Sequence, residues 1–341
     1  MHAPLAQRQS ICAIAVTYHP DREFPDRIRL IEGQVGGLVI VDNGSSPAAL
    51  AMLQSLAASP STTLVSNAAN LGVATALNIG LRHAASLGFA WVLLLDQDSV
   101  AHADMVSELC AVLATVSNPT TLAVIGSNFI DVNIDPANGN APQITPAIVC
   151  GPNTNGAGND GVSSNDVGIT DPNAGAGMAR QNPAGGTWDE VEYVITSGSL
   201  VSLPAQAVIG PFREELFIDY VDMEYCLRAR AKGFRVIKTR RAIMTHAIGA
   251  YSKHRWMGKI KWTTNHSAER RYYIARNDTV MLREYGRYPL GLWRWKSFVR
   301  SFRLCKRIAL FEDLKRSKIA AVWAGWWDGI RGRLGPRSLS E

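Results

Sequence analysis

The stretch Trp91-Val92-Leu93-Leu94-Leu95-Asp96-Gln97-Asp98 decides the fold class. Five apolar residues in a row predict a buried strand, and two carboxylates follow it one residue apart. Because alternate side chains of an extended chain lie on one face, Asp96 and Asp98 can point into the same space. Two such acids repel each other unless a cation lies between them, and Mg²⁺ or Mn²⁺ prefers oxygen ligands. An acidic turn after the strand is the alternative interpretation. The Asp-x-Asp pair alone does not favour either a turn or a metal site.

Strand patterns alternate with helix patterns on both sides of this stretch. We predict strands at Ile11–Thr17, Leu38–Val41, Leu64–Val65, Trp91–Leu95 and Ala123–Gly126. We predict helices at Phe24–Val35, Val73–Leu87 and Asp104–Val116. This alternation is typical of an α/β fold with a mostly parallel sheet flanked by helices. In such sheets ligands bind beyond the carboxyl ends of the strands, where Asp96 and Asp98 lie.

The rest of the chain divides into a loop, a short α/β segment and a helical region. Residues 131–186 are rich in Asn, Gly, Pro and Ser, which predicts a long loop or a partly disordered insertion. Order returns with Val191–Ile195, Ser199–Val201, a helix at Val221–Lys232 and a strand at Phe234–Ile237. From Ser267 the pattern is helical and basic. We therefore expect an α/β domain over 1–260, with the loop at about 131–190, and a basic helical region over 261–341.

Composition and cysteine spacing restrict the class of protein. With 47% hydrophobic and 19% charged residues, the 341-residue chain is expected to fold. The five cysteines form no Cys-x-x-Cys pair, which argues against a zinc site or a disulfide framework and fits a reducing compartment. We see no signal peptide and no apolar run of about 20 residues. We expect a cytoplasmic protein.

Charge is unevenly distributed along the chain. Residues 228–341 hold 28 of the 35 Lys and Arg residues but only 7 of the 29 Asp and Glu residues. Within this region, 293–307 and 315–331 combine tryptophans with cations, as do amphipathic helices that lie on anionic membranes. Packing or homo-oligomerisation by helices with solvated basic faces is an equal alternative. Nucleic acid is a third candidate partner for the basic region, but the acidic character of residues 1–227 disfavours it.

Polar clusters follow the predicted strands. Thr17-Tyr18 ends the first strand, and Asp42-Asn43-Gly44-Ser45 ends the second, where an acid can accept hydrogen bonds from a ribose or a base. The second cluster by itself is more often a plain turn. Asn70 and Gly72 precede a helix, whose N-terminus favours an anion, although Asn70 can equally be an N-cap. A glycine-rich dinucleotide fingerprint is absent.

A second acidic segment begins the helix near residue 221. Asp219 and Asp222 can offset the helix dipole or can position a general base. Glu224 and Arg228 have the spacing of a surface ion pair. His246 follows a strand-like stretch, and a lone histidine there is usually structural.

In their order along the chain, these clusters resemble the inverting family 2 glycosyltransferases of GT-A fold. The first half of the resemblance is carried by Thr17-Tyr18, Asp42-Asn43-Gly44-Ser45, Asn70-Leu71-Gly72 with Asn78-x-Gly80, and Asp96-Gln97-Asp98. Ser197-Gly198, the segment 217–228 and His246 match the second half, so the resemblance covers about residues 10–280. The segments Phe-Ile-Asp-Tyr-Val-Asp-Met-Glu-Tyr-Cys-Leu-Arg and Leu-Leu-Asp-Gln-Asp-Ser resemble the rhamnosyltransferases of bacterial surface polysaccharide synthesis.

The resemblance implies a role for each matching residue. Nucleotide-sugar binding falls to Thr17, Tyr18, Asp42, Asn43, Asn70, Gly72, Asn78, Asp96 and Gln97. Ser197, Gly198 and Asp219 are expected on the acceptor side of the site. Asp98 and His246 are expected to bind a Mg²⁺ or Mn²⁺ ion. Asp222 lies at the position of the family's catalytic base. This chain has Val221 where the family's motif has Glu, so Asp219, Asp222 and Glu224 all remain candidates for the base.

The resemblance also implies the reaction. We expect inverting, metal-dependent transfer of a sugar, L-rhamnose from dTDP-L-rhamnose, to a hydroxyl of a saccharide or polyprenyl-linked saccharide. That acceptor would place the protein peripherally on the inner face of the cell membrane. Transfer of galactofuranose or glucose is an alternative. A catalytically inactive, membrane-associated glycan-binding module is another.

Overall fold

The computed structural model describes residues 7–131, 186–246, 252–256, 259–286, 288 and 291–337. They form two compact units, one made of 7–131 with 186–246 and the other of 252–337. Most of the predicted loop at 131–190 therefore lies outside the described residues. None of the described helices combines the length and the apolar character needed to span a bilayer.

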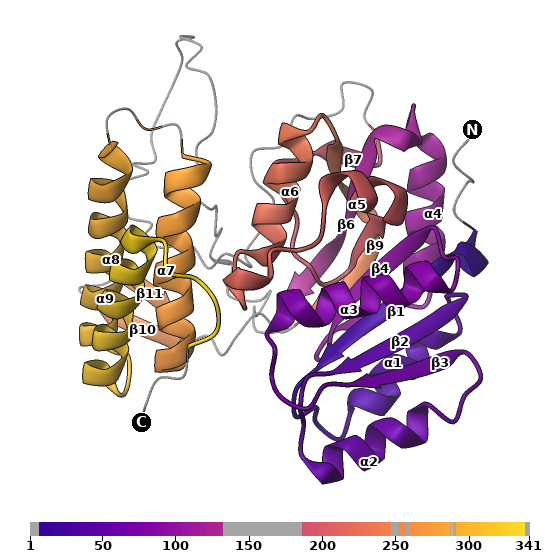
Figure 1. Cartoon of the computed structure of the whole chain (residues 1–341), viewed down its shortest axis with the longest axis horizontal. Helices are drawn as coiled ribbons and strands as arrows, with labels where there is room; N and C mark the ends of the chain where they lie inside the picture. Colours follow the sequence, from indigo (N-terminus) through magenta and orange to yellow (C-terminus); the bar gives the residue numbers. More distant parts are fainter. Residues whose placement is uncertain are drawn as a thin grey trace. The chain divides into compact units, whose positions relative to one another are not determined.

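Within its described residues, the first unit is a nine-stranded sheet with packed helices (Figure 1). The strands are β1 Ile11–Thr17, β2 Gly37–Asp42, β3 Thr62–Ser66, β4 Trp91–Asp96, β5 Val100–Ala101, β6 Leu122–Asp131, β7 Trp188–Glu190, β8 Ser199–Ser202 and β9 Arg235–His246. The helices are α1 Phe24–Glu32, α2 Pro47–Leu56, α3 Val73–Ser86, α4 Met105–Thr115, α5 Leu203–Ile209 and α6 Val221–Ala231. Short 3₁₀ turns are η1 Arg8–Ser10, η2 Pro119–Thr121 and η4 Glu214–Leu216. The predicted α/β class is confirmed.

The strand order is β3-β2-β1-β4-β8-β6-β9-β5, and β7 also pairs with β9. The first four strands are parallel, as is the pair β6–β9, whereas β8, β5 and β7 pair antiparallel. In this register Thr17 lies opposite Asp42, and Val16 lies opposite Asp96. The carboxyl ends of β1, β2 and β4 therefore meet at one edge of the sheet.

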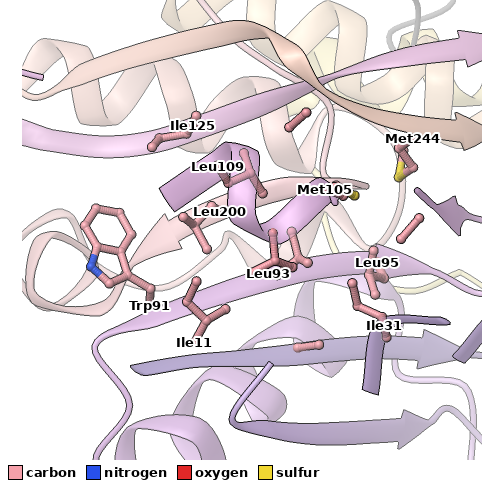
Figure 2. Close-up of a cluster of buried hydrophobic side chains, with 14 of the residues drawn as sticks. Ile11, Ile31, Trp91, Leu93, Leu95, Met105, Leu109, Ile125, Leu200 and Met244 are labelled. Atoms are coloured by element: carbon pink, nitrogen blue, oxygen red, sulfur yellow. The ribbon is translucent and has the colours of Figure 1, made fainter. Parts of the chain in front are cut away.

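The central strands are buried on both faces, which explains why they read as continuous apolar runs. Alternate residues of β1 and β4 pack with α1 and α4 in one large cluster (Figure 2). On the opposite face of β1, Ile14 lies against α3, where a Cβ added to Gly80 would approach Ile14 Cγ2 to 2.6 Å. This helix can lie close to the sheet because residue 80 is a glycine.

The connection between β4 and β5 is too short for a flat sheet. Four strand spacings separate these strands in the sheet order, or about 19 Å if the sheet were flat. Only the three residues 97–99 connect them, and the four steps from Asp96 to Val100 reach at most about 14 Å. The sheet must therefore curl, so that β9 and β5 approach the end of β4.

The described residues of the second unit form a hairpin and three helices. Its elements are β10 Ser252–Trp256, β11 Lys259–Thr263, α7 Ala268–Glu284, α8 Leu292–Phe311 and α9 Lys315–Arg331. The three helices pack on one another and lie side by side in Figure 1. The first begins where predicted, with Ser267 as an N-cap that accepts a hydrogen bond from the Arg270 amide. The described part of the predicted helical region is confirmed, and the hairpin was not predicted.

Candidate active site

The ends of β1 and β2 are held by a hydrogen-bonded acid. Asp42 is buried and accepts from Thr17 Oγ1 at 3.1 Å and from the Ser45 amide at 3.0 Å. The Ser45 hydroxyl is a further donor to Asp42, at 2.5 Å. Thr17 and Asp42, both predicted to hold the nucleoside, are therefore in direct contact. Ser45 was not among the predicted site residues, although its place three residues after an Asp is typical of a turn of this kind.

Asn43 connects the second strand to the loop before α3. Its side-chain oxygen accepts from Asn67 Nδ2 and from the Leu71 amide, both at 3.1 Å. Its amide group donates to Asn70 Oδ1 at 2.9 Å and to the Gly72 carbonyl at 3.2 Å. Three predicted residues, Asn43, Asn70 and Gly72, thus form one network. The N-cap of α3 is Gly72 rather than Asn70, which instead accepts from the Gly72 amide at 3.0 Å.

Gly72 brings this loop against the acidic segment. Its φ is +84°, and an added Cβ would lie 2.7 Å from the Phe217 carbonyl oxygen and 2.6 Å from the Phe217 ring. The same carbonyl accepts a hydrogen bond from the Ala74 amide at 3.4 Å. A side chain at residue 72 would displace Phe217, which was not predicted as a site residue.

The end of β4 carries three half-buried polar side chains, Asp96, Gln97 and Asp98. Gln97 Oε1 accepts from the Tyr18 amide at 2.8 Å, and the Gln97 carbonyl accepts from Arg27 Nε at 3.0 Å. The Tyr18 side chain is 47% exposed. Tyr18 and Gln97, predicted for the same ligand, therefore lie together at the surface of this edge.

Ser197 and Gly198 support the strand end from within the protein. The Asp96 amide donates to Ser197 Oγ at 3.1 Å, and Ser197 Oγ lies 2.5 Å from Ser99 Oγ. A Cβ on Gly198, whose φ is +77°, would lie 2.2 Å from Ser127 Oγ. Both residues are buried, and their observed contacts position β4; their assignment to the acceptor side stays a prediction.

The acidic segment has an unusual backbone. Phe217, Asp219 and Tyr220 have φ values of 65°, 61° and 65°. Such conformations are costly for residues with a Cβ, and they cluster at functional sites. They direct the chain into the first turn of α6, where Asp222 lies buried.

Asp222 is held by two backbone donors. Its Oδ2 accepts from the Thr196 amide at 3.1 Å, and its Oδ1 from the Met223 amide at 2.8 Å. The pKa of Asp222 is raised from 3.8 to about 7, mainly by burial; the two hydrogen bonds lower it, and the charges of Asp96 and Asp219 contribute to the rise. Asp96 at the end of β4, Asp219 before α6 and Asp222 within α6 therefore interact electrostatically. Thr196 had no signal in the sequence because it acts through its backbone.

Glu224, another candidate base, is occupied by an ion pair. Its two carboxylate oxygens accept from Arg228 Nε and Nη2, each at 3.0 Å. Arg228 also donates to the Ile209 and Pro211 carbonyls, at 2.8 and 2.7 Å. Through these bonds Arg228 connects α6 to the end of α5 and to the segment that follows it. The Glu224 side chain is only 3% exposed, so the pair lies in the interior rather than at the surface expected from its spacing.

Asn78 lies in α3 and is fully occupied by protein contacts. Its Nδ2 donates to the Phe212 carbonyl at 2.8 Å and to Glu214 Oε1 at 2.9 Å, and its Oδ1 accepts from the Phe212 amide at 2.9 Å. These contacts position the segment that precedes η4. Nucleotide binding by Asn78 stays a prediction.

The backbone places His246 close to the acids after β4. It is the last residue of β9 and lies one position beyond the pair Val100–Thr245. Its side chain lies outside the described set. Among the side chains that the structure describes, no group of three or more His, Cys, Asp and Glu residues is arranged to hold a metal ion.

Comparisons with known proteins agree with this architecture. The family model "Glycosyl transferase family 2" matches residues 36–139. The dTDP-rhamnosyl transferase RfbF of Shigella flexneri is 28% identical over 276 residues, which are 81% of this chain and 80% of that protein.

Two solved structures share the fold. The mannosyltransferase PcManGT from Pyrobaculum calidifontis, in complex with GDP-Man and Mn²⁺, has a TM-score of 0.54 at 13% identity, over 96% of this chain and 89% of that chain. Residues 1–349 of S. aureus TarS, in complex with UDP-GlcNAc, have a TM-score of 0.53 at 11% identity, over 94% of this chain and 81% of that chain.

The fold is GT-A-like, and the family-model match supports a glycosyltransferase. More particularly, the match over residues 36–139 and the similarity to RfbF support a family 2 glycosyltransferase related to the rhamnosyltransferases. The predicted family and enzyme class are thereby confirmed.

Proposed function

We propose that this enzyme transfers L-rhamnose from dTDP-L-rhamnose to a hydroxyl of a saccharide or polyprenyl-linked saccharide in surface glycan synthesis, with inversion at the anomeric carbon. The related RfbF is named as a dTDP-rhamnosyl transferase, which supports this donor. The observation that carries the proposal is Asp222, a buried carboxyl group whose pKa of about 7 suits a general base near neutral pH.

In the proposed reaction Asp222 takes the proton of the acceptor hydroxyl. The acceptor oxygen then forms a bond to the anomeric carbon, and the bond from that carbon to the diphosphate oxygen breaks on the opposite face. The electron pair of the broken bond leaves with dTDP, so the new linkage has the inverted configuration. The leaving diphosphate needs no proton, so one base is sufficient.

The donor would bind along the edge formed by β1, β2 and β4. Thr17, Asp42 and the Asn43 network would hold the nucleoside, and Asp96 would lie on the ribose side. Asp98, two residues beyond Asp96, carries a hard oxygen donor suited to Mg²⁺ or Mn²⁺. Such an ion would supply positive charge to the diphosphate when bound. His246 would be its second ligand.

We also propose a cytoplasmic location, at the inner face of the cell membrane. All four described cysteines, Cys12, Cys110, Cys226 and Cys305, are free thiols, which suits a reducing compartment.

The donor is tested with purified full-length protein and a panel of dTDP-L-rhamnose, UDP-galactofuranose, UDP-glucose and GDP-mannose. We expect calorimetry to show the tightest binding for dTDP-L-rhamnose, and mass spectrometry to show rhamnose transferred to a lipid-linked saccharide extract. Preference for another donor would replace rhamnose in the proposal. Donor binding without turnover on any acceptor would favour the inactive binding module.

The metal role of Asp98 is tested by dTDP binding with Mg²⁺, with Mn²⁺ and with EDTA. We expect Asp98→Ala to remove the gain in dTDP affinity that metal provides to the wild type. Asp104→Ala is the matched control, because Asp104 is an exposed acid nearby that makes no side-chain capping bond. Equal metal dependence in Asp98→Ala and wild type would exclude Asp98 as a ligand.

A further inference from the structure

Helix α8 of the second unit has two chemically different sides. One side is buried and includes Ser297, Ser301, Leu304 and Ile308. The other side exposes Leu292, Trp295, Phe302 and Leu310, whose exposed fractions are 42, 62, 55 and 41%. Their spacing of three, seven and eight residues places these four side chains on one stripe of the helix. We call them, together with the half-buried Phe298, the aromatic face.

The aromatic face is continuous with a packed cluster of rings. The Phe298 ring centre lies 5.7 Å from that of Trp295 and 6.5 Å from that of Phe302. It also lies 5.4 Å from Trp323 and 5.8 Å from Trp326 of α9. The exposed rings are therefore supported by the helix pair rather than extended freely into solvent. A supported apolar surface of this kind is typical of a binding face.

The charge around this face is strongly positive. The α8 sequence contains six Arg and Lys residues and no acid, and residues 292–337 contain 12 basic and 3 acidic residues. Of those acids, Glu312 is buried against Arg271 and Lys318, and Asp328 is paired with Arg337. Lys296, Arg303 and Lys306 are exposed on α8 beside the aromatic face. The partner should therefore be anionic as well as apolar.

We propose that the aromatic face of α8 binds the surface of an anionic lipid bilayer, with the helix axis in the plane of the interface. Tryptophan and phenylalanine side chains enter the boundary between headgroups and acyl chains, while lysine and arginine contact anionic headgroups. None of the described helices can span the bilayer, which agrees with binding at its surface. The proposal does not depend on the identity of the sugar donor.

Charge also favours lipid over a second copy of the chain. In a symmetric dimer through α8, the helix would face its own copy, and the exposed Lys296, Arg303 and Lys306 would approach the same cations of that copy with no acid of α8 between them. Like charges placed together in an interface are unfavourable. An anionic membrane surface instead complements both the apolar stripe and its cations.

The test is sedimentation of the full-length protein with lipid vesicles, without nucleotide or metal. We expect the protein to pellet with vesicles of phosphatidylcholine and phosphatidylglycerol, to pellet less with phosphatidylcholine alone, and to be released by salt. Failure of the wild type to bind anionic vesicles would overturn the proposal.

Two variants separate the apolar and electrostatic contributions. W295A/F302A should reduce partitioning at least about tenfold, because two exposed aromatic side chains no longer enter the interface. R303E/K306E should reduce it more than about twentyfold, since each cation near an anionic surface contributes about fivefold. The matched controls are L87A and R82E, which alter exposed residues of the first unit and should bind as the wild type does.

Further measurements distinguish the outcomes. Far-UV circular dichroism of each variant should match the wild type, since the altered side chains are exposed. Light scattering after gel filtration tests self-association. A wild-type dimer that W295A/F302A converts to a monomer, with vesicle binding unchanged, would assign the face to a second copy instead. Nucleotide binding should be the same in all variants, so failure here is distinct from failure of the proposed function.

Discussion

Asp222 differs from its two acidic neighbours in what surrounds its carboxyl group. Glu224 is neutralised by Arg228, whereas Asp222 faces two backbone donors and the charges of Asp96 and Asp219. Burial is the main reason that its pKa rises, and the nearby acids add to it. A carboxylate that is easily protonated near neutral pH is also a stronger base than an ordinary aspartate. Among the three candidates, Asp222 is therefore the best suited to accept a proton.

Replacing Asp222 by Asn removes the proposed base with little change in size. We expect the rate of sugar transfer to fall about 10²- to 10⁴-fold, with dTDP affinity nearly unchanged. Steady-state kinetics and calorimetry measure the two quantities. In the wild type, kcat/KM should rise with pH to about 7 and then level off, because the base acts in its deprotonated form. Wild-type turnover in the variant would transfer the role to Asp219.

Asp219 offers a second test, through its charge. Asp219→Asn removes a negative charge near Asp222, so the pKa of Asp222 should fall and the acid limb of the kcat/KM profile should move to lower pH. The plateau at high pH should keep most of its height. A profile with an unmoved acid limb would exclude this electrostatic link. A loss of about 10²-fold at every pH would make Asp219 the base.

At the scale of elements, α3 and α6 are connected through the contact of Gly72 with Phe217. Gly72→Ala would force a methyl group against the Phe217 carbonyl, at a backbone conformation that only glycine adopts readily. We expect a loss of about 2–4 kcal/mol in the free energy of unfolding and a marked loss of transfer activity. Urea denaturation measures the first quantity.

Gly210→Ala is the matched control for this prediction. Gly210 has φ 97° and ψ 172°, close to the φ 84° and ψ 160° of Gly72. The atom nearest to its added Cβ is Arg228 Nη1 at 3.2 Å, at the end of a flexible side chain. Both variants carry backbone strain, and only Gly72→Ala carries the clash with Phe217. Equal stability and activity in the two variants would show that this contact is unimportant.

The sequence was sufficient for elements with strong apolar patterns. Ile11–Thr17 matches β1, and the helices beginning at Phe24 and Val73 were found within a few residues of their ends. The helix α2, Pro47–Leu56, was missed, although Ser46 caps it and Pro47 begins it. Strand β9 was predicted only to Ile237, because the polar run Thr239-Arg240-Arg241 interrupts the apolar pattern and only its pairing partners reveal the strand.

For the site, the strand ends were predictable and the contacts between distant segments were not. Parallel strands bring Thr17, Asp42 and Asp96 to one edge, so spacing along the sequence was enough. The contact of Gly72 with Phe217 and the bond from the Thr196 amide to Asp222 join residues far apart in the chain. Such contacts arise from tertiary packing. A glycine or a backbone amide produces no sequence pattern from which they could be predicted.

At the scale of the whole molecule, Asp222 makes stability depend on pH. Its pKa is about 7 in the folded protein and ordinarily 3.8, so between these values the folded state binds more protons than the unfolded state. Stability contributed by this group is therefore present at low pH, falls as pH rises through this window, and is level above it. The difference in pKa corresponds to about 4 kcal/mol.

The Asp222→Asn variant has no carboxyl group to titrate at this position. The pH dependence of its free energy of unfolding should therefore differ from that of the wild type. Measured without nucleotide or metal, the stability of the variant relative to the wild type should increase by up to about 4 kcal/mol between pH 4 and pH 7. Above pH 7 the difference should be constant. Urea denaturation at several pH values measures it, and a relative stability that does not change with pH would contradict the raised pKa.

The three-residue connection between β4 and β5 has a consequence for how such chains can diverge. The connection closes as a turn in which the Ser99 amide donates to the Asp96 carbonyl at 3.2 Å, so its length sets where Asp98 lies after β4. One residue more or fewer would break this turn and shift the segment that carries Asp98 relative to the end of β9. Among functional relatives with this sheet order, we expect insertions and deletions here to be rare.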